Sequence, residues 1–140
     1  MNLVLCFFFP FVLNGSNLSK TDSLLNLIND NPDDSVKVKL LSKLGSIFYY
    51  DEKDFLNSKK YWELALELSK ENKYLEGEIT ALNLLSIYYI NSSDFENALE
   101  LIYKRLELYE SQNKIKGIVD CYNSIGCVWV DLQNDNKALE

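Results

Sequence analysis

The stretch NLLSIYYINSSDFENALE (residues 83–100) decides the fold, because the chain repeats it forty residues earlier and forty residues later. The matching stretches are KLGSIFYYDEKDFLNSKK (residues 43–60) and NSIGCVWVDLQNDNKALE (residues 123–140). Side-chain size recurs as well as polarity, since Tyr49, Tyr89 and Trp129 share one column. A fixed period of about 20 to 50 residues is typical of units that cannot bury their apolar faces alone, so the pattern predicts stacked units.

Apolar residues within each unit recur at helical spacing. Phe95, Leu99 and Ile102 step by four and three residues, and no sustained alternation indicates a strand. The spacing predicts a short helix over residues 21–30, followed by helices over 34–51, 54–71, 74–91, 94–111, 114–131 and from 134 onward. Ser93 and Glu96 have the spacing of a capping box, which predicts that Ser93 begins the helix of residues 94–111. The expected fold is an all-α solenoid of antiparallel helix pairs, with units at 34–73, 74–113 and an incomplete 114–140.

Several aromatic side chains fall on the apolar stripes of these helices, so they are expected to fill the core rather than bind a ligand. They are Tyr49, Trp62, Tyr89 and Trp129. The cysteines Cys121 and Cys127 are six residues apart on one expected helix, which places them on different faces, and they are interpreted as small core residues.

The composition argues against several functions. The net charge of −7 disfavours binding to nucleic acid or to an anionic membrane surface. The chain contains no histidine, which removes the usual general base and the commonest metal ligand. The acidic turns at 51–54 and 131–136 lack the glycine and distal glutamate of a calcium loop, so helix capping is the expected role. The sequence therefore predicts a protein that is not an enzyme and that uses no cofactor or metal.

Residues 1–15 form an uncharged apolar run with the length of a signal-peptide core, too short to span a bilayer. A signal peptide cleaved near residues 14–16 predicts export to an extracytoplasmic or periplasmic location. An uncleaved anchor and a buried element are the alternatives, and the latter implies a cytoplasmic protein. Residues 16–33 are expected to form a linker and the short first helix.

The repeated residues resemble the tetratricopeptide repeat. That family has a small residue on the first helix, an aromatic residue three positions later and an alanine twelve positions after the small one, as in Ser86, Tyr89 and Ala98. The other units offer Ser46, Tyr49 and Ser58, and Gly126, Trp129 and Ala138. The resemblance implies a right-handed solenoid. The period of forty exceeds the usual length of about 34, and Arg105 occupies a position that is usually small, where it is expected to extend its charge to solvent.

The repeat style, together with the expected signal peptide, is similar to the sensory amino-terminal regions of bacterial signalling proteins with a histidine kinase or helix-turn-helix output domain. The resemblance implies a non-catalytic protein- or peptide-binding fragment of such a protein. Residues 138–140 lie one turn into the expected second helix of a third unit, so the segment is expected to be truncated. The alternative is a standalone envelope scaffold for protein assembly.

First helices of such a solenoid line its concave side, where a protein or peptide segment is expected to bind. The positions facing away from the packing stripe are Lys43, Asn83 and Asn123 in one row, Asp51, Asn91 and Asp131 near the helix ends, and Tyr50, Ile90 and Val130 between them. The asparagines can hydrogen-bond a peptide backbone. Solvated polar positions are the alternative interpretation. A chaperone-tail carboxylate clamp is disfavoured, because the intervening row is Ile47, Ile87 and Cys127.

Overall fold

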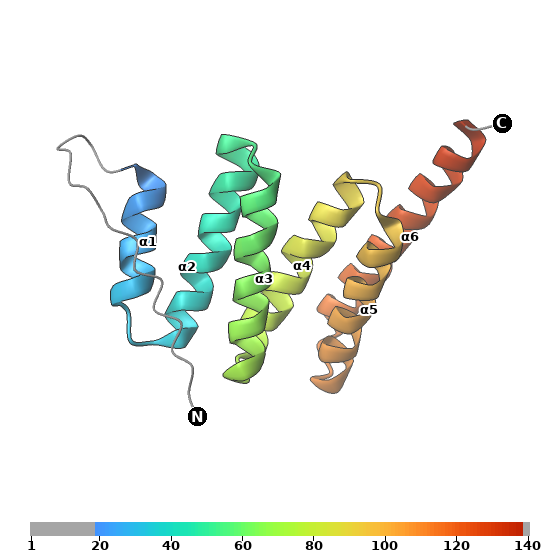
Figure 1. The fold of residues 1–140 in the computed structure, drawn as a ribbon. Coiled ribbons are helices and arrows are strands. Elements are labelled where there is room, and N and C mark those ends of the chain that lie inside the picture. Colours follow the sequence, from blue (N-terminus) through green and yellow to red (C-terminus); the bar gives the residue numbers. More distant parts are fainter. Residues whose placement is uncertain (1–18, 139–140) are drawn as a thin grey trace, which may run out of the picture.

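The computed structural model describes residues 19–138, and every regular element in this range is helical. The elements are α1 (Lys20–Asp30), α2 (Asp34–Ile47), the π-helical turn η1 (Phe48–Glu52), α3 (Phe55–Glu71), α4 (Leu75–Asn91), α5 (Phe95–Ser111) and α6 (Ile115–Ala138). Figure 1 shows successive helices side by side and running in alternate directions, with α1 and α6 at opposite ends. The predicted all-α, solenoid-like arrangement of helix pairs is confirmed.

The turns between helices repeat every twenty residues. Four residues have a left-handed backbone, with φ between 53° and 57°: Lys53, Lys73, Ser93 and Asn113. After α3, the amide of Tyr74 donates to the carbonyl of Ser69 (2.8 Å), and the amide of Lys73 donates to the carbonyl of Lys70 (3.1 Å). The same pair of bonds follows α4 and α5. This Schellman motif satisfies the last carbonyls of each helix and reverses the chain.

The predicted capping box at Ser93 is wrong, because Ser93 is the left-handed residue that ends α4. Asp94 is the N-cap of α5, and its carboxylate accepts a hydrogen bond from the amide of Asn97 (3.3 Å). Asp54 caps α3 in the same way, through the amide of Asn57 (3.0 Å). One residue therefore closes each helix, and the next residue begins the following one.

The predicted break between residues 131 and 134 is also wrong, because α6 continues without interruption to Ala138. Gln133 lies twenty residues after Asn113, where the period would place the next left-handed residue, but it is helical. A left-handed backbone costs a residue other than glycine about 1–2 kcal/mol. No described helix follows α6, so no packing contact of a second helix offsets this cost in the described part of the chain. Ala138 therefore belongs to the first helix of its unit, not to the second.

Trp62 is the central side chain of the first helix pair, and it is fully buried. Its indole N–H donates to the carbonyl of Ser42 in α2 (3.1 Å). Gly45 permits this approach, because a Cβ at Gly45 would lie 2.6 Å from the indole ring. The ring of Tyr49 packs beside Trp62, with centroids 5.3 Å apart, and is 8% exposed. The predicted core positions of Trp62 and Tyr49 are confirmed.

The aromatic residues of the later units are less buried. Tyr89 is half-buried, and the ammonium of Lys59 lies 5.0 Å from the centroid of its ring. Hydrogen bonding with the Tyr89 hydroxyl raises the pKa of Lys59. Trp129 is 57% exposed, so its predicted core position is wrong. The physical reason is that no described helix covers the outer side of α6, against which Trp129 would otherwise pack.

The predicted signal peptide of residues 1–15 lies outside the described residues. Within the described part of the chain, none of the helices combines the length and the apolar character that a membrane-spanning helix needs.

Substitution of the two tryptophans compares a buried indole in α3 with an exposed indole in α6. Trp62→Ala leaves a cavity between α2 and α3, so the free energy of unfolding is expected to fall by about 3–5 kcal/mol. Trp129→Ala is the matched control and is expected to change it by less than about 0.5 kcal/mol. Urea denaturation followed by circular dichroism gives both values. Equal losses for the two variants would contradict the burial described above.

Acid titration tests the cap of α3. The amide and side chain of Asn57 hydrogen-bond the Asp54 carboxylate and lower its pKa below the usual 3.8. A lowered folded-state pKa stabilises the fold above the unfolded-state value, and this stabilisation is lost as the pH falls through the folded-state value. Asp54→Asn is therefore expected to flatten the fall of Tm below about pH 4. The exposed Asp30→Asn is the control, and an equal flattening by this variant would refute the cap's role.

Candidate binding surface

The nine residues predicted to bind a partner all lie on α2, η1, α4 or α6. We call the side of the molecule that these elements line the first-helix surface. Seven of the nine side chains are exposed, and two are half-buried. The exposed ones are Lys43, Tyr50, Asp51, Asn91, Asn123, Val130 and Asp131, and the half-buried ones are Asn83 and Ile90.

Three of these residues also hold the units together. The side-chain amide of Asn91 donates to the hydroxyl of Tyr49 in the preceding unit (2.6 Å). The carboxylate of Asp51 lies 3.4 Å from the ammonium of Lys20 in α1. Ile90 packs against the apolar cluster between α5 and α6. The residues near the helix ends therefore contact neighbouring helices and also contribute to the exposed surface.

Asn83 lies beside a pocket of about 270 Å³ between α4, α5 and α6. Polar side chains dominate its lining: Thr80 and Asn83 from α4, Arg105 and Tyr109 from α5, and Asp120 and Ser124 from α6. The pocket thus lies between the first helices of two successive units, and the second helix of the earlier unit forms its floor. Of the predicted residues, only Asn83 belongs to it.

Arg105 forms the floor of this pocket and is only 5% exposed. The side chain is therefore buried instead of extended along the surface, and its guanidinium borders the pocket. Its Nε–H donates to the sulfur of Cys121 (3.3 Å), and an Nη2–H donates to the hydroxyl of Ser124 (3.2 Å). Neither acceptor is a carboxylate, and no carboxylate of the described residues lies within ion-pair distance of the guanidinium. A buried cation without a paired anion is rare in folded proteins.

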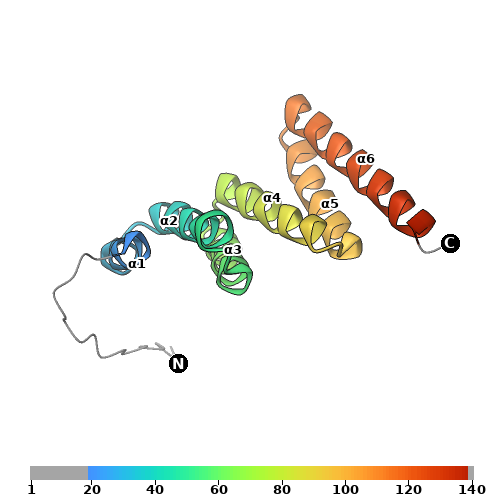
Figure 2. The ribbon, with the colours of Figure 1, turned by 90° about the horizontal axis from the view of Figure 1, so that it is seen from above.

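Side-chain size explains why this pocket is larger than the one between α2 and α4 in the earlier unit, which has a volume of about 170 Å³. Ala65 and Ser69 occupy the corresponding positions of α3, and both are fully buried. There α2 packs directly on α4, whereas α4 and α6 make at most a marginal contact. Figure 2 shows α5 lying between α4 and α6. Arg105 and Tyr109 are larger than their counterparts, so they keep the two first helices apart and open the pocket between them.

The sequence contained a signal for this pocket that the interpretation of surface rows missed. Arg105 is the only arginine of the chain, and it stands forty residues after a buried alanine. Tyr109 likewise follows Ser69 at the same interval, one helical turn further along. Two large polar residues at adjacent positions of a packing stripe indicate a widened interface. The hydrogen bonds of Arg105 with Ser124 and Cys121 could not be predicted, because they depend on how far α6 lies from α4 and α5.

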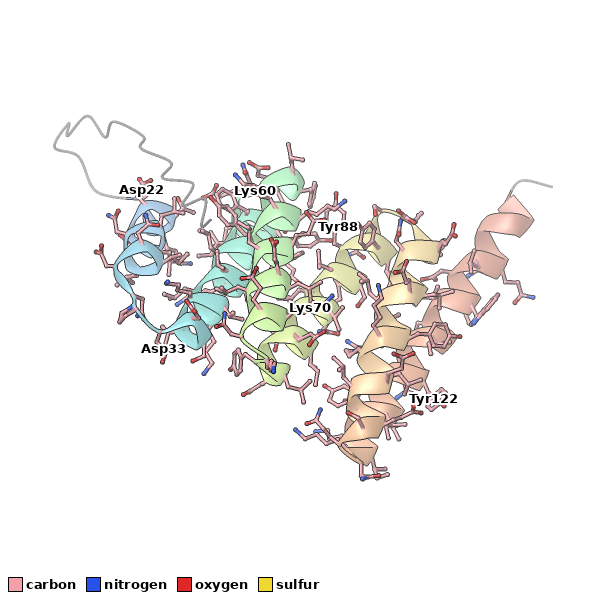
Figure 3. The ribbon with its side chains drawn as sticks, turned by 60° about the horizontal axis from the view of Figure 1, so that its bottom comes forward. Asp22, Asp33, Lys60, Lys70, Tyr88 and Tyr122 are labelled. Atoms are coloured by element: carbon pink, nitrogen blue, oxygen red, sulfur yellow. The ribbon has the colours of Figure 1, made fainter. Side chains whose placement is uncertain are left out.

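The outer side of α6 is a second exposed surface. Its apolar residues recur at intervals of four and three: Ile115, Val119, Tyr122 and, seven residues on, Trp129. Gly126 lies in the same stripe, with no neighbouring atom within 4 Å of the position a Cβ would take. Figure 3 shows Tyr122 projecting from α6 on the side away from α1. In α4, the corresponding Leu82 and Ser86 are buried, so this stripe is the packing face of a first helix.

The two described cysteines have different surroundings. Cys121 is buried and accepts the hydrogen bond from Arg105, as expected for a core residue. Cys127 is exposed, so its predicted core position is wrong. The two do lie on different faces of α6, as their spacing predicted. Within residues 19–138, no group of three or more cysteine, aspartate or glutamate side chains has the arrangement of a metal site.

Comparison with known proteins adds no family: no protein-family model matches the chain, and no curated protein is significantly similar to it.

Alanine substitution of two glycines tests whether the outer side of α6 is open. Gly126→Ala is expected to raise the free energy of unfolding by about 0.5–1 kcal/mol, because alanine favours the helix and the added methyl group meets no neighbour. Gly45→Ala is the contrasting variant, in which the methyl group meets Trp62 and costs about 1–3 kcal/mol. Thermal and urea denaturation give the sign of each change. A loss of stability in Gly126→Ala would show that this face is covered.

Proposed function

We propose that this chain is a non-catalytic module of the tetratricopeptide-repeat type that binds a protein or peptide segment on its first-helix surface. The observation that carries the proposal is the polar pocket between α4 and α6, with Asn83 at its side. A groove between successive first helices lies where an extended segment can cross several units of a solenoid. Asn83 and Asn123 are one repeat apart, so one segment can meet both amide groups.

The charge and exposure of the surface support a peptide partner. Lys43 and Asn123 are exposed in the same row as Asn83, and Tyr50 and Val130 are exposed apolar side chains next to that row. Amide side chains can donate to and accept from a peptide backbone, while the apolar residues contact its side chains. The arrangement suits an extended segment rather than a folded domain, because the polar and apolar positions form rows along the stack.

We further propose that the module is exported and forms the sensory part of a larger bacterial signalling protein, with a histidine kinase or helix-turn-helix output. The exposed apolar stripe of α6 supports this proposal, because a following helix of a longer chain could pack there as α5 packs on α4. A gene whose reading frame continues into a membrane helix and an output domain would support it. A frame that ends after residue 140 would contradict it.

The second candidate is a standalone envelope scaffold. The apolar stripe on α6 favours this scaffold role, because Tyr122 and Trp129 are large apolar side chains that are exposed on its outer side, where a helix of another protein can pack. In a scaffold, this surface would bind a helix of another envelope protein. Small and apolar residues of that helix would recur at the intervals found in α5. The reading frame beyond residue 140 separates the two candidates.

The asparagine row is tested by selecting heptapeptides from a displayed library on the full chain and measuring their affinity by calorimetry. The double variant Asn83→Ala and Asn123→Ala is expected to bind a selected peptide about tenfold or more weakly, because hydrogen bonds to its backbone are lost. The fold should be retained, since neither side chain is fully buried.

The matched control is the double variant Asn26→Ala and Asn29→Ala, which removes two exposed asparagines from α1. It is expected to bind the selected peptide like the unmodified chain. Equal affinity for all three proteins would show that the peptide does not use the asparagine row. Failure to select any peptide would contradict the proposed binding of an extended segment.

A further inference from the structure

The guanidinium of Arg105 is the most unusual group of the described chain. It is buried to 5% exposure and belongs to the only arginine in the sequence. A guanidinium carries five N–H donors. Two of them are used, on the thiol of Cys121 and the hydroxyl of Ser124. The remaining donors have no acceptor among the described side chains, and the residue lines an open pocket.

A buried charge is costly unless an ion of opposite sign or several hydrogen bonds compensate for it. The hydrogen bonds to Cys121 and Ser124 provide part of that compensation, and the remaining donors are open to the pocket, because no guanidinium nitrogen is both buried and without a partner. The fold nevertheless holds the guanidinium in place from α6, so it is preorganised rather than free to move to solvent. We propose that the pocket is a carboxylate-binding site, in which Arg105 forms charge-assisted hydrogen bonds with an acidic group of a bound peptide.

The lining of the pocket matches a single carboxylate. The side-chain amide of Asn83 and the hydroxyl groups of Thr80 and Tyr109 line the same cavity, and each can hydrogen-bond an anionic oxygen. The volume of about 270 Å³ accepts one side chain or one terminal residue but not a longer segment. Asp120 also lines the pocket and is exposed. Its charge disfavours a doubly charged phosphate more than a singly charged carboxylate.

The inference rests on the proposed function, because a bound peptide brings the carboxylate to the first-helix surface. It names the chemistry that this peptide requires, an acidic side chain or a free carboxyl terminus placed beside Asn83. The cation comes from the second helix of a unit, α5, and not from the first helices.

Because Arg105 is the only arginine, its side-chain N–H gives a unique signal in nitrogen-15 NMR spectra of the full chain. The probes are N-acetylalanine for a terminal carboxylate and N-acetylglutamic acid α-amide for a side-chain carboxylate. Their neutral counterparts are N-acetylalanine amide and N-acetylglutamine amide. A saturable shift of the Arg105 signal is expected for at least one acid, with binding at least about tenfold weaker for its neutral counterpart. The stronger of the two acids identifies the source of the carboxylate.

Three variants assign the binding to this pocket. Arg105→Ala removes the guanidinium and is expected to abolish the probe-induced shift of the Ser124 backbone amide. It should still fold, because Ala65 occupies the same position one unit earlier. Arg105→Lys keeps the charge but not the parallel donors, so weaker binding is expected. Lys104→Ala removes an exposed charge next in sequence and is expected to bind like the unmodified chain.

Absence of any saturable shift, or equal shifts by acids and neutral amides, would overturn the inference. Binding that appears only in Asp120→Asn would also overturn it, by showing that Asp120 neutralises Arg105 in the unmodified chain. These experiments need no peptide partner. A bound carboxylate without any selected peptide would therefore contradict the proposed function alone, and selected peptides without carboxylate dependence would contradict this inference alone.

Discussion

The structure depends on a backbone constraint that recurs every twenty residues: a residue other than glycine must adopt a left-handed conformation. Lys53, Lys73, Ser93 and Asn113 all do so, and each lies between two helices that pack on each other. The conformation is unfavourable by about 1–2 kcal/mol. Packing of the next helix compensates for it, so each turn exists only because a helix follows. α6 illustrates the converse, since Gln133 stays helical and the described part of the chain holds no following helix.

This regular frame makes differences between units informative. Ala65 and Arg105 occupy the same place, one repeat apart, but the first allows two first helices to meet and the second holds them apart. Gly45 has a comparable effect, because its missing Cβ lets Trp62 approach α2. In a repeated backbone, the size of a few side chains therefore decides how closely two first helices approach and how large the pocket between them is.

The sequence predicted much of the fold because its evidence is local and repeated. Most helix boundaries agree with the prediction to within about one residue, as the apolar stripes and acidic caps require. Its errors have a common cause. The spacing of Ser93 and Glu96 predicts a cap, but this spacing cannot show which residue adopts a left-handed backbone. Trp129 is predicted to lie in the core because it shares a packing column with Tyr49 and Tyr89, but no described helix covers the outer side of α6.

The sequence by itself determined the helical class, the period, the positions of most turns and the absence of histidine chemistry, because these follow from composition and from contacts within one or two helical turns. Only the tertiary structure decided that α6 continues past residue 133, that Trp129 is exposed although Tyr49 in the same column is buried, and that Arg105 lies beneath a pocket with Asn83. These properties depend on distances between helices that are far apart in the chain, and those distances are set by the sum of many packing contacts.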